Sequence, residues 1–279
     1  IGLGKIFGFT YLGSGTDGKE ALSAMKDKAR KILSVVLVFI AVACAGYLLW
    51  YYGSAVKAKK SQDNAKKIAN KAETPVVDEQ PEEQVEIPID FPSLQETNPD
   101  VYAWIQIEGT VIDYPVLQSA EDDSYYLDHS WERKSAPEGA IFSQACNSKD
   151  FTDFNTVLYG HQMGDKVETM FHQLGNYLDA EFMKSHRDIV IYTPDHIRTY
   201  RVFAAVVYDD RHLIQHYNYV MDSERQDFID SIYNSRDLRN QFCDDVEVTT
   251  TSQILSLSTC IAAEPSHRLL VEAVLVDEK

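Results

Sequence analysis

The chain has 279 residues, enough for one large or two small domains, and it carries 43 Asp and Glu residues against 26 Lys and Arg. The formal net charge of -17 argues against nucleic acid or an anionic membrane surface as the main partner. Four cysteines show no C-x-x-C spacing, which disfavours a zinc site or a redox pair, although a disulfide between Cys146 and Cys243 stays open. Neighbouring acids lack the alternating spacing of a calcium loop, so we expect no metal and no other cofactor.

One segment near the N-terminus is apolar enough to cross a membrane. Residues 32–56 form a run of 25 positions without a charged side chain, which suffices for a hydrocarbon core of about 30 Å. Trp50, Tyr51 and Tyr52 stand at its far end, where amphipathic rings favour the membrane interface. A cleaved signal peptide would have a shorter apolar core, so we expect a retained transmembrane anchor.

Basic residues flank this segment on both sides, four before it and six after it, so the positive-inside rule alone does not orient it. We expect residues 1–31 to be a short cytoplasmic segment, because this is the first span and a large acidic domain follows. Residues 57–88 are expected to begin as a charged juxtamembrane helix and to end as an acidic linker with three prolines, which cannot build a core. The folded domain is expected over residues 89–279.

Beyond the linker the pattern is mostly that of β-strands. We predict strands at 101–107, 111–116, 140–143, 155–159, 188–192, 197–208, 254–260 and 268–276, and a helical turn at 125–127. The spacing of apolar side chains predicts an amphipathic helix over 168–184, and a Ser223-x-x-Gln226 capping box predicts the start of another. The fold class is therefore mainly β with inserted helices, as in a barrel closed by its last strands.

The strand that ends at Cys260 carries a candidate nucleophile. Leu255, Leu257 and Thr259 face one way and Cys260 faces the other way with two serines, so we expect a half-buried strand ending in a partly exposed thiol. Such a thiol becomes a nucleophile when a cation or an imidazole lies nearby. Arg268 begins the next strand and would supply the cation. On these residues alone, a buried structural cysteine with a surface arginine is the alternative.

His161 is the candidate imidazole among eight histidines. It follows an apolar strand and a glycine, at a strand end, where loops build sites. The other histidines lie in polar or helical surroundings and are expected at the surface: His129, His172, His186, His196, His212, His216 and His267. Cysteine, histidine and arginine form a nucleophilic set, in which the thiol attacks a carbonyl, the imidazole moves protons and the guanidinium stabilises the oxyanion.

These motifs together resemble the signature of class B sortases. The resemblance rests on the Tyr-Gly-His of residues 155–163, on Leu-Ser-Thr-Cys ending at Cys260 and on the downstream Arg268, and it covers roughly residues 90–279. Gln162 departs from the Asn that many members have there, a change that we do not expect to affect the chemistry. The resemblance implies an eight-stranded β-barrel with an added N-terminal helical region and a long helix between the sixth and seventh strands.

The resemblance also implies a function, that of a single-pass membrane protein with a cysteine transpeptidase domain outside a Gram-positive cell. Cys260 would cleave an Asn-Pro-x-Thr-like C-terminal sorting motif of a secreted protein, and an amine of a peptidoglycan precursor would resolve the acyl-enzyme. His161 would move the protons, Arg268 would hold the carbonyl oxygen, and Thr259 would contact the substrate.

The residues leave alternatives open. The same domain could polymerise pilins, with a lysine side chain as the acceptor, or could act as a protease that passes its acyl group to water. An anchored binding ectodomain with a structural cysteine would instead tolerate replacement of Cys260, His161 and Arg268. The resting protonation of Cys260 and His161 is also open, because a thiol beside an imidazole can be neutral or an ion pair.

Overall fold

A computed structural model describes residues 17–70, 85–163, 168–262 and 264–279, and the chain divides into two compact units between Gly53 and Ser54. The long helix α1 (Asp17–Ala69) is apolar enough over part of its length to cross a membrane, by length and composition. Parts of the expected cytoplasmic segment and of the acidic linker, at residues 1–16 and 71–84, lie outside the described residues. The predicted division at residues 31, 56 and 88 stays a prediction.

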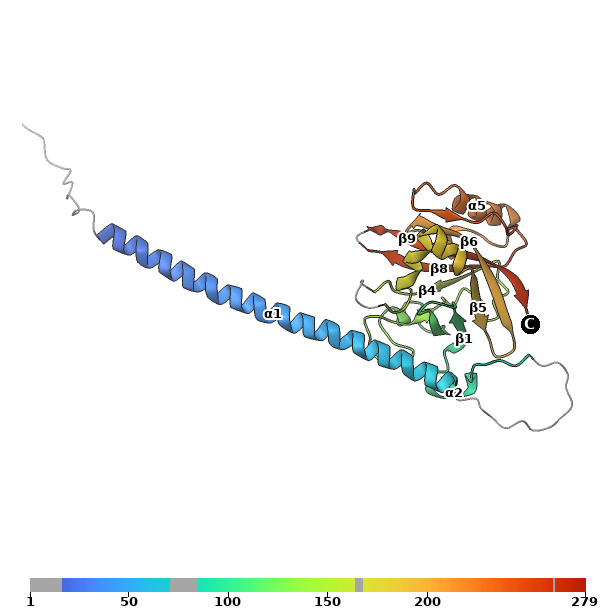
Figure 1. The fold of residues 1–279 in the computed structure, drawn as a ribbon, viewed down its shortest axis with the longest axis horizontal. Coiled ribbons are helices and arrows are strands. Elements are labelled where there is room, and N and C mark those ends of the chain that lie inside the picture. The colour runs from blue at the N-terminus through green and yellow to red at the C-terminus, as the bar shows by residue number, and fades with distance from the viewer. Residues whose placement is uncertain (1–16, 71–84, 164–167, 263) are drawn as a thin grey trace, which may run out of the picture. The chain divides into compact units, whose positions relative to one another are not determined.

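The second unit is built on a closed barrel (Figure 1). Its strands are β1 (Val101–Gln106), β2 (Asp113–Leu117), β3 (Ile141–Phe142), β4 (Asn155–Tyr159), β5 (Asp188–Tyr192), β6 (Ile197–Asp209), β7 (Gln241–Phe242), β8 (Ile254–Ile261) and β9 (Glu264–Glu278). The order is β5-β1-β2-β3-β4-β8-β9-β6, and pairing of β5 with β6 closes the ring of eight strands, while β7 pairs with β6 outside it. All eight predicted strands form, and the predicted eight-stranded barrel is confirmed.

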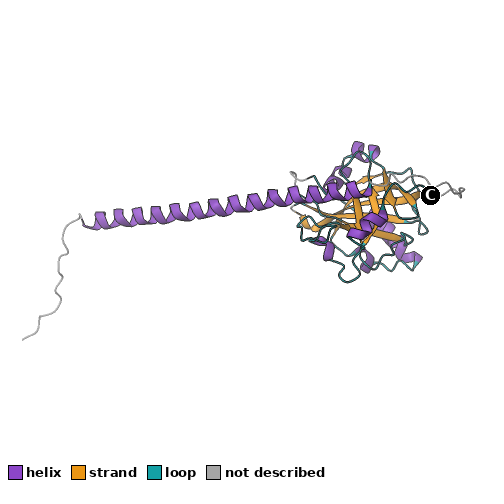
Figure 2. Cartoon of the chain, turned by 90° about the horizontal axis from the view of Figure 1, so that it is seen from below, coloured by secondary structure: helices purple, strands orange, loops and turns teal. Residues whose placement is uncertain are grey.

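Short helices surround the strands at the centre of the domain (Figure 2). They are α2 (Phe91–Thr97), the 3-10 helices η1 (Tyr125–Leu127) and η2 (His172–Leu178), α3 (Ala180–Ser185), α4 (Leu213–His216) and α5 (Asp222–Tyr233). The single helix predicted over 168–184 is wrong. Asp179 adopts an extended conformation and caps α3 by accepting the backbone N–H groups of Glu181 and Phe182, so η2 ends there and a new helix begins.

The capping box predicted for the helix at Ser223 is also wrong, although the helix itself forms. α5 begins earlier, because the Met221 carbonyl accepts the N–H groups of Glu224 and Arg225, and no side chain caps this end. The buried face of α5 carries Phe228, Ile229 and Ile232, whereas Tyr233, which the apolar spacing also placed on this face, is exposed.

The core occupies both faces of the sheet. Leu255 and Leu257 of β8 join the cluster that fills the barrel and draws on all eight of its strands. On the other face, Phe228 of α5 belongs to a second apolar cluster, and Ser256 and Ser258 are buried there as well. The expectation of a half-buried β8 is therefore wrong, because helices and loops cover its outer face. Only the end of the strand, at Cys260, is exposed.

The last turns of α1 belong to the same compact unit as the barrel. Ala65 and Ala69 pack in a cluster with Trp104 and Trp131, and the Trp131 indole Nε1 donates to the backbone oxygen of Ser61 at 2.9 Å. Small side chains let the helix approach the aromatic rings closely, so this contact buries apolar area on both partners.

A buried polar row runs along the outer face of the strands that carry the candidate site. Glu272 on β9 is fully buried opposite Ser256, which donates its hydroxyl to Glu272 Oε2 at 2.7 Å. The Ser256 hydroxyl also lies 2.9 Å from Asn155 Oδ1 on β4, and Glu272 Oε1 has no hydrogen-bond partner among the described residues. Burial raises the pKa of the Glu272 carboxyl to about 8, and the bond from Ser256 opposes that shift.

Glu272→Gln is expected to flatten the dependence of stability on pH. Because the folded pKa of about 8 lies above the ordinary value of 4.5, unfolding releases a proton between these values. The stabilising contribution is therefore complete below that window and is lost as the pH rises through it, at a rate on the order of 1 kcal/mol per pH unit.

Urea unfolding at about pH 5 and about pH 8 measures this effect as the difference between the two free energies of unfolding. The wild type should lose more stability than Glu272→Gln over that interval. Equal losses in both proteins would show that Glu272 does not titrate in this window.

Candidate active site

The candidate nucleophile, Cys260, lies at the point where β8 emerges from the buried interior. The strand is buried from Ile254 to Thr259, and Cys260 is the first exposed residue. Cys260 lies on the same face as Ser256 and Ser258, because side chains alternate along a strand. The thiol is therefore held by a buried strand and open to a substrate.

Arg268 lies directly opposite Cys260 in the antiparallel pair of β8 and β9. Opposed residues in such a pair have Cα atoms about 5 Å apart and side chains on the same face. The Nη1 group of Arg268 donates to the backbone oxygens of Pro265 and His267, each at 2.9 Å. Its Nε and Nη2 groups have no hydrogen-bond partner among the residues that the structure describes, so they remain free to donate to a substrate oxygen.

His161 reaches the same edge from the other neighbour of β8. β4 runs parallel to β8 with Tyr159 opposite Ser258, and the Gly160 N–H donates to the Ser258 oxygen at 3.2 Å. His161 follows two residues after the end of this ladder, and the same register continued that far would bring it level with Cys260. Cys260 and Arg268 are thus paired across β8 and β9, and His161 follows β4 at the same edge of the sheet.

Two side-chain contacts tie the segment around His161 to the segment around Cys260. The Thr259 hydroxyl donates to the Gly160 oxygen at 2.7 Å, and Gln162 Oε1 accepts the Ala262 N–H at 2.9 Å. One contact lies just before the histidine and cysteine and the other just after them, so together they fix the spacing of the two segments. Gln162 therefore has a structural role, holding the segment after Cys260, that the sequence did not indicate. The predicted contact of Thr259 with substrate stays a prediction.

Gly160 is required by close packing rather than by an unusual backbone angle. A Cβ atom there would lie 2.5 Å from Ile141 and 2.7 Å from Phe171, both buried side chains. Phe171 also donates its backbone N–H to the His161 oxygen at 3.1 Å. The glycine before the histidine thus lets the turn after β4 lie against the core.

The His161 imidazole is oriented by one backbone contact. Its Nε2 lies 2.8 Å from the Leu127 oxygen, and because a carbonyl only accepts, Nε2 carries a proton there. Nδ1 is then the nitrogen left for proton transfer. Glu138, which the sequence did not single out, is buried near this ring: burial raises the pKa of its carboxyl, and the charge of His161 opposes that shift.

Among the described residues, no three His, Cys, Asp or Glu side chains are grouped so that they could hold a metal ion. Cys44, Cys146, Cys243 and Cys260 are all free thiols, so the Cys146–Cys243 pairing left open by the sequence does not form in this structure.

Comparison with known proteins gives the family. The sortase domain family matches residues 105–276, well over half of the chain. The chain belongs to the sortase family. Sortase B of Listeria monocytogenes is 32% identical over 187 residues, which cover 66% of this chain and 72% of that protein. Sortase B of Staphylococcus aureus is 27% identical over 251 residues, 89% of this chain and 98% of that protein.

Solved structures agree with this assignment. Sortase B from Bacillus anthracis superposes with a TM-score of 0.67 at 31% identity, covering 81% of this chain and 99% of that structure. The protein is thus a class B sortase and a cysteine transpeptidase, as the resemblance of its motifs indicated, rather than a non-catalytic binding ectodomain.

Thr259→Val is expected to lower the free energy of unfolding of this sortase by about 1 kcal/mol, because it removes the hydroxyl that bonds the Gly160 oxygen. Thr259→Ser keeps the hydroxyl and serves as the matched control. The midpoint of urea unfolding at constant slope measures both variants. Equal midpoints for the Val and Ser variants would show that the contact with Gly160 contributes nothing.

Proposed function

We propose that Cys260 is the nucleophile of this sortase, with His161 as general acid and base and Arg268 as the oxyanion donor. The observation that carries the proposal is the register of three neighbouring strands: Arg268 lies opposite Cys260, and β4 ends two residues before His161 at the same edge of the sheet. Cys260 is also exposed at the end of a buried strand, as a nucleophile for a peptide must be.

In the first half of the reaction the proton of the Cys260 thiol is held on Nδ1 of His161, and the thiolate sulfur attacks the carbonyl carbon of the scissile peptide bond. The free N–H groups of Arg268 donate to the carbonyl oxygen as it gains charge, which stabilises the tetrahedral intermediate. The intermediate collapses when the carbon–nitrogen bond breaks, and His161 donates a proton through Nδ1 to the leaving amine. The product is a thioester between Cys260 and the substrate acyl group.

In the second half an amine replaces the departed peptide. His161 accepts a proton from the incoming amine, the nitrogen attacks the thioester carbonyl, and the carbon–sulfur bond breaks to restore Cys260. The result is a new amide bond, with the proton balance closed. Water in place of the amine would give a carboxylic acid instead.

For the substrates we propose an Asn-Pro-x-Thr-like sorting motif near the C-terminus of secreted proteins, and an amine of a peptidoglycan precursor as the acceptor. Membership of class B supports this choice. A lysine side chain of a pilin subunit is the alternative acceptor, and the amines offered in the experiment below distinguish the two.

Cys260→Ala is expected to abolish amide formation, and Arg268→Lys to lower kcat about 100-fold, because one oxyanion donor contributes that much or more. His161→Gln should lose both proton transfers. The full-length protein in detergent is incubated with sorting-motif peptides and either a small peptide amine or a lysine peptide, and products are measured by mass spectrometry. Cys146→Ala, which removes another exposed thiol, is the matched control and should remain active.

Each result of this experiment has a distinct meaning. Amide product that disappears in Cys260→Ala supports the assignment, and the preferred amine identifies the acceptor class. Acid product alone, with every amine offered, would favour a protease. Full activity in Cys260→Ala would refute the assignment of the nucleophile.

We further propose that residues 32–56 anchor the enzyme in the cell membrane with the barrel outside a Gram-positive cell. The apolar helix supports this, and an enzyme that acts on exported proteins needs its site on that side. A variant with Cys260 as its sole cysteine should react with a membrane-impermeant maleimide on intact cells. A variant with Ser23→Cys as its sole cysteine should react only after lysis, and the reverse pattern would show the opposite orientation.

A further inference from the structure

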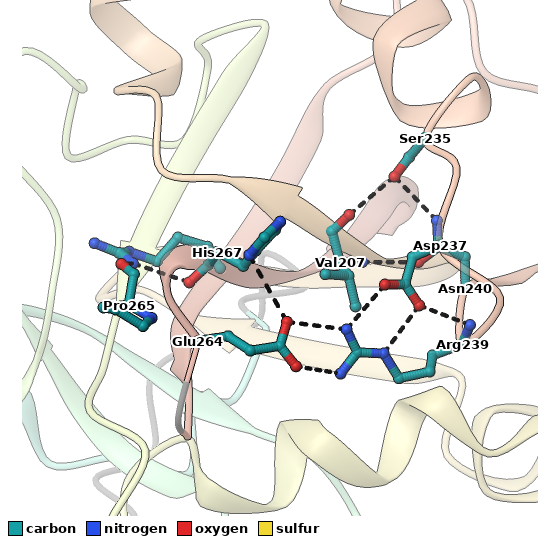
Figure 3. Close-up of polar contacts among 9 residues, drawn as sticks. Val207, Ser235, Asp237, Arg239, Asn240, Glu264, Pro265 and His267 are labelled. Carbon is teal, nitrogen blue, oxygen red and sulfur yellow. Dashed lines mark hydrogen bonds and ion pairs between the residues drawn. The ribbon is translucent and has the colours of Figure 1, made fainter.

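The stretch of chain from Cys260 near the end of β8 to Arg268 in β9 is called here the β8–β9 connection. A network of charged side chains contacts it from another part of the domain (Figure 3). Glu264 is at the start of β9, four residues from Cys260 and four from Arg268. Its carboxylate faces Arg239, which lies in the segment after α5, so the network links two parts of the chain that are distant in sequence.

The Arg239 guanidinium uses its planar fork on two carboxylates. It binds Glu264 through Nη1 at 2.8 Å and Nη2 at 3.1 Å, and Asp237 through Nε and Nη2, both at 2.9 Å. Paired contacts of this kind fix orientation as well as distance. These bonds also hold the pKa of the Asp237 carboxyl down to about 2 and lower that of Glu264.

The segment that carries Arg239 is itself fixed to the barrel (Figure 3). Asn240 Oδ1 accepts the Val207 N–H at 2.8 Å, and the Asn240 amide donates to the Ser235 hydroxyl, which donates to the Val207 oxygen. Val207 belongs to β6 and lies opposite Leu269 of β9, the residue after Arg268. Leu238, between Asp237 and Arg239, is fully exposed, so polar contacts rather than apolar packing hold this turn.

The position of the connection directly affects where the guanidinium of Arg268, the candidate oxyanion donor, lies. Arg268 rests its Nη1 group on the oxygens of Pro265 and His267, which follow Glu264 in the chain. A shift of Glu264 therefore displaces the carbonyls on which the guanidinium lies. His267 also faces Glu264, with Nδ1 at 3.7 Å from the carboxylate.

We propose that Arg239 is a positioning residue of this sortase: through Glu264 it sets the β8–β9 connection and thereby the Arg268 guanidinium relative to Cys260. The proposal rests on the function proposed above, in which Arg268 meets the substrate oxygen. Arg239 itself touches no reacting atom. It acts by keeping the Arg268 guanidinium in the geometry that the transition state needs, because a displacement of this donor by about 1 Å lowers the rate strongly.

Arg239→Gln and Glu264→Gln, singly and together, test the proposal in the full-length protein in detergent. The matched control is Arg201→Gln, because Arg201 binds Asp188 through two hydrogen bonds at a similar side-chain exposure, 38% against 41% for Arg239, on the hairpin of β5 and β6. Two quantities are measured: kcat and KM for amide formation, and amide hydrogen exchange of peptides that contain residues 264–268.

Arg239→Gln and Glu264→Gln should each lower kcat about tenfold, with KM changed less than about twofold. The double variant should be no slower than the single variants. Amide hydrogen exchange of the connection should rise in Arg239→Gln and Glu264→Gln and stay at the wild-type level in Arg201→Gln. This split between kcat and KM, absent in the control, distinguishes positioning from a general loss of stability.

Three results would overturn the proposal. Unchanged amide exchange in Arg239→Gln would show that the connection is held without the contact between Arg239 and Glu264. Raised exchange with unchanged kcat would show that the connection does not position the site. Additive losses in the double variant would show that Arg239 and Glu264 act separately. Wild-type protein without amide product would instead refute the proposed function, and with it the positioning role, whereas exchange would still report whether Arg239 restrains the connection.

Discussion

The site depends on the hydrogen-bonded place of β8 between a parallel neighbour and an antiparallel one. Pairing with β9 sets Arg268 opposite Cys260, and pairing with β4 brings His161 to the same edge. Side chains alternate with a period of two, so a slip of one residue in either ladder would turn a member of the set to the other face. The backbone ladders of three strands thus decide the geometry, and the loops refine it.

Closure of the barrel buries the face opposite the thiol, and the cover of helices and loops buries the rest of its own face. The row that leads to Cys260 must therefore keep polar side chains inside the protein. The Ser256 hydroxyl contacts both Asn155 and Glu272 there, and one Glu272 oxygen has no partner among the described residues. A neutral carboxyl fits this place better than an ionised one, because an unpaired charge would be far more costly to bury.

Local patterns predicted much of this, since strands and apolar faces are recorded in neighbouring residues. The eight strands followed from alternation, and the pairing of a thiol with a guanidinium followed from the short interval between Cys260 and Arg268. The burial of Ser256 and Ser258 did not, because the apolar cluster on that face of the sheet includes residues more than twenty positions away, such as Phe228. The contact of Gln162 with Ala262 spans 100 residues and leaves no local pattern. The break at Asp179 escaped notice because apolar spacing alone does not distinguish one helix from two short ones.

The two ends of the site are held by restraints of different strength. Cys260 ends a strand that is buried on both faces, and loosening it means opening a cooperative ladder. The connection after it is held by Gln162 on one limb and by Arg239 on the other, through side chains that are partly exposed. Exposed ion pairs contribute about 0–1 kcal/mol each, so the connection opens at a much lower cost than the sheet unfolds. Changes in these contacts therefore alter the place of the Arg268 guanidinium while the barrel and the thiol stay in position.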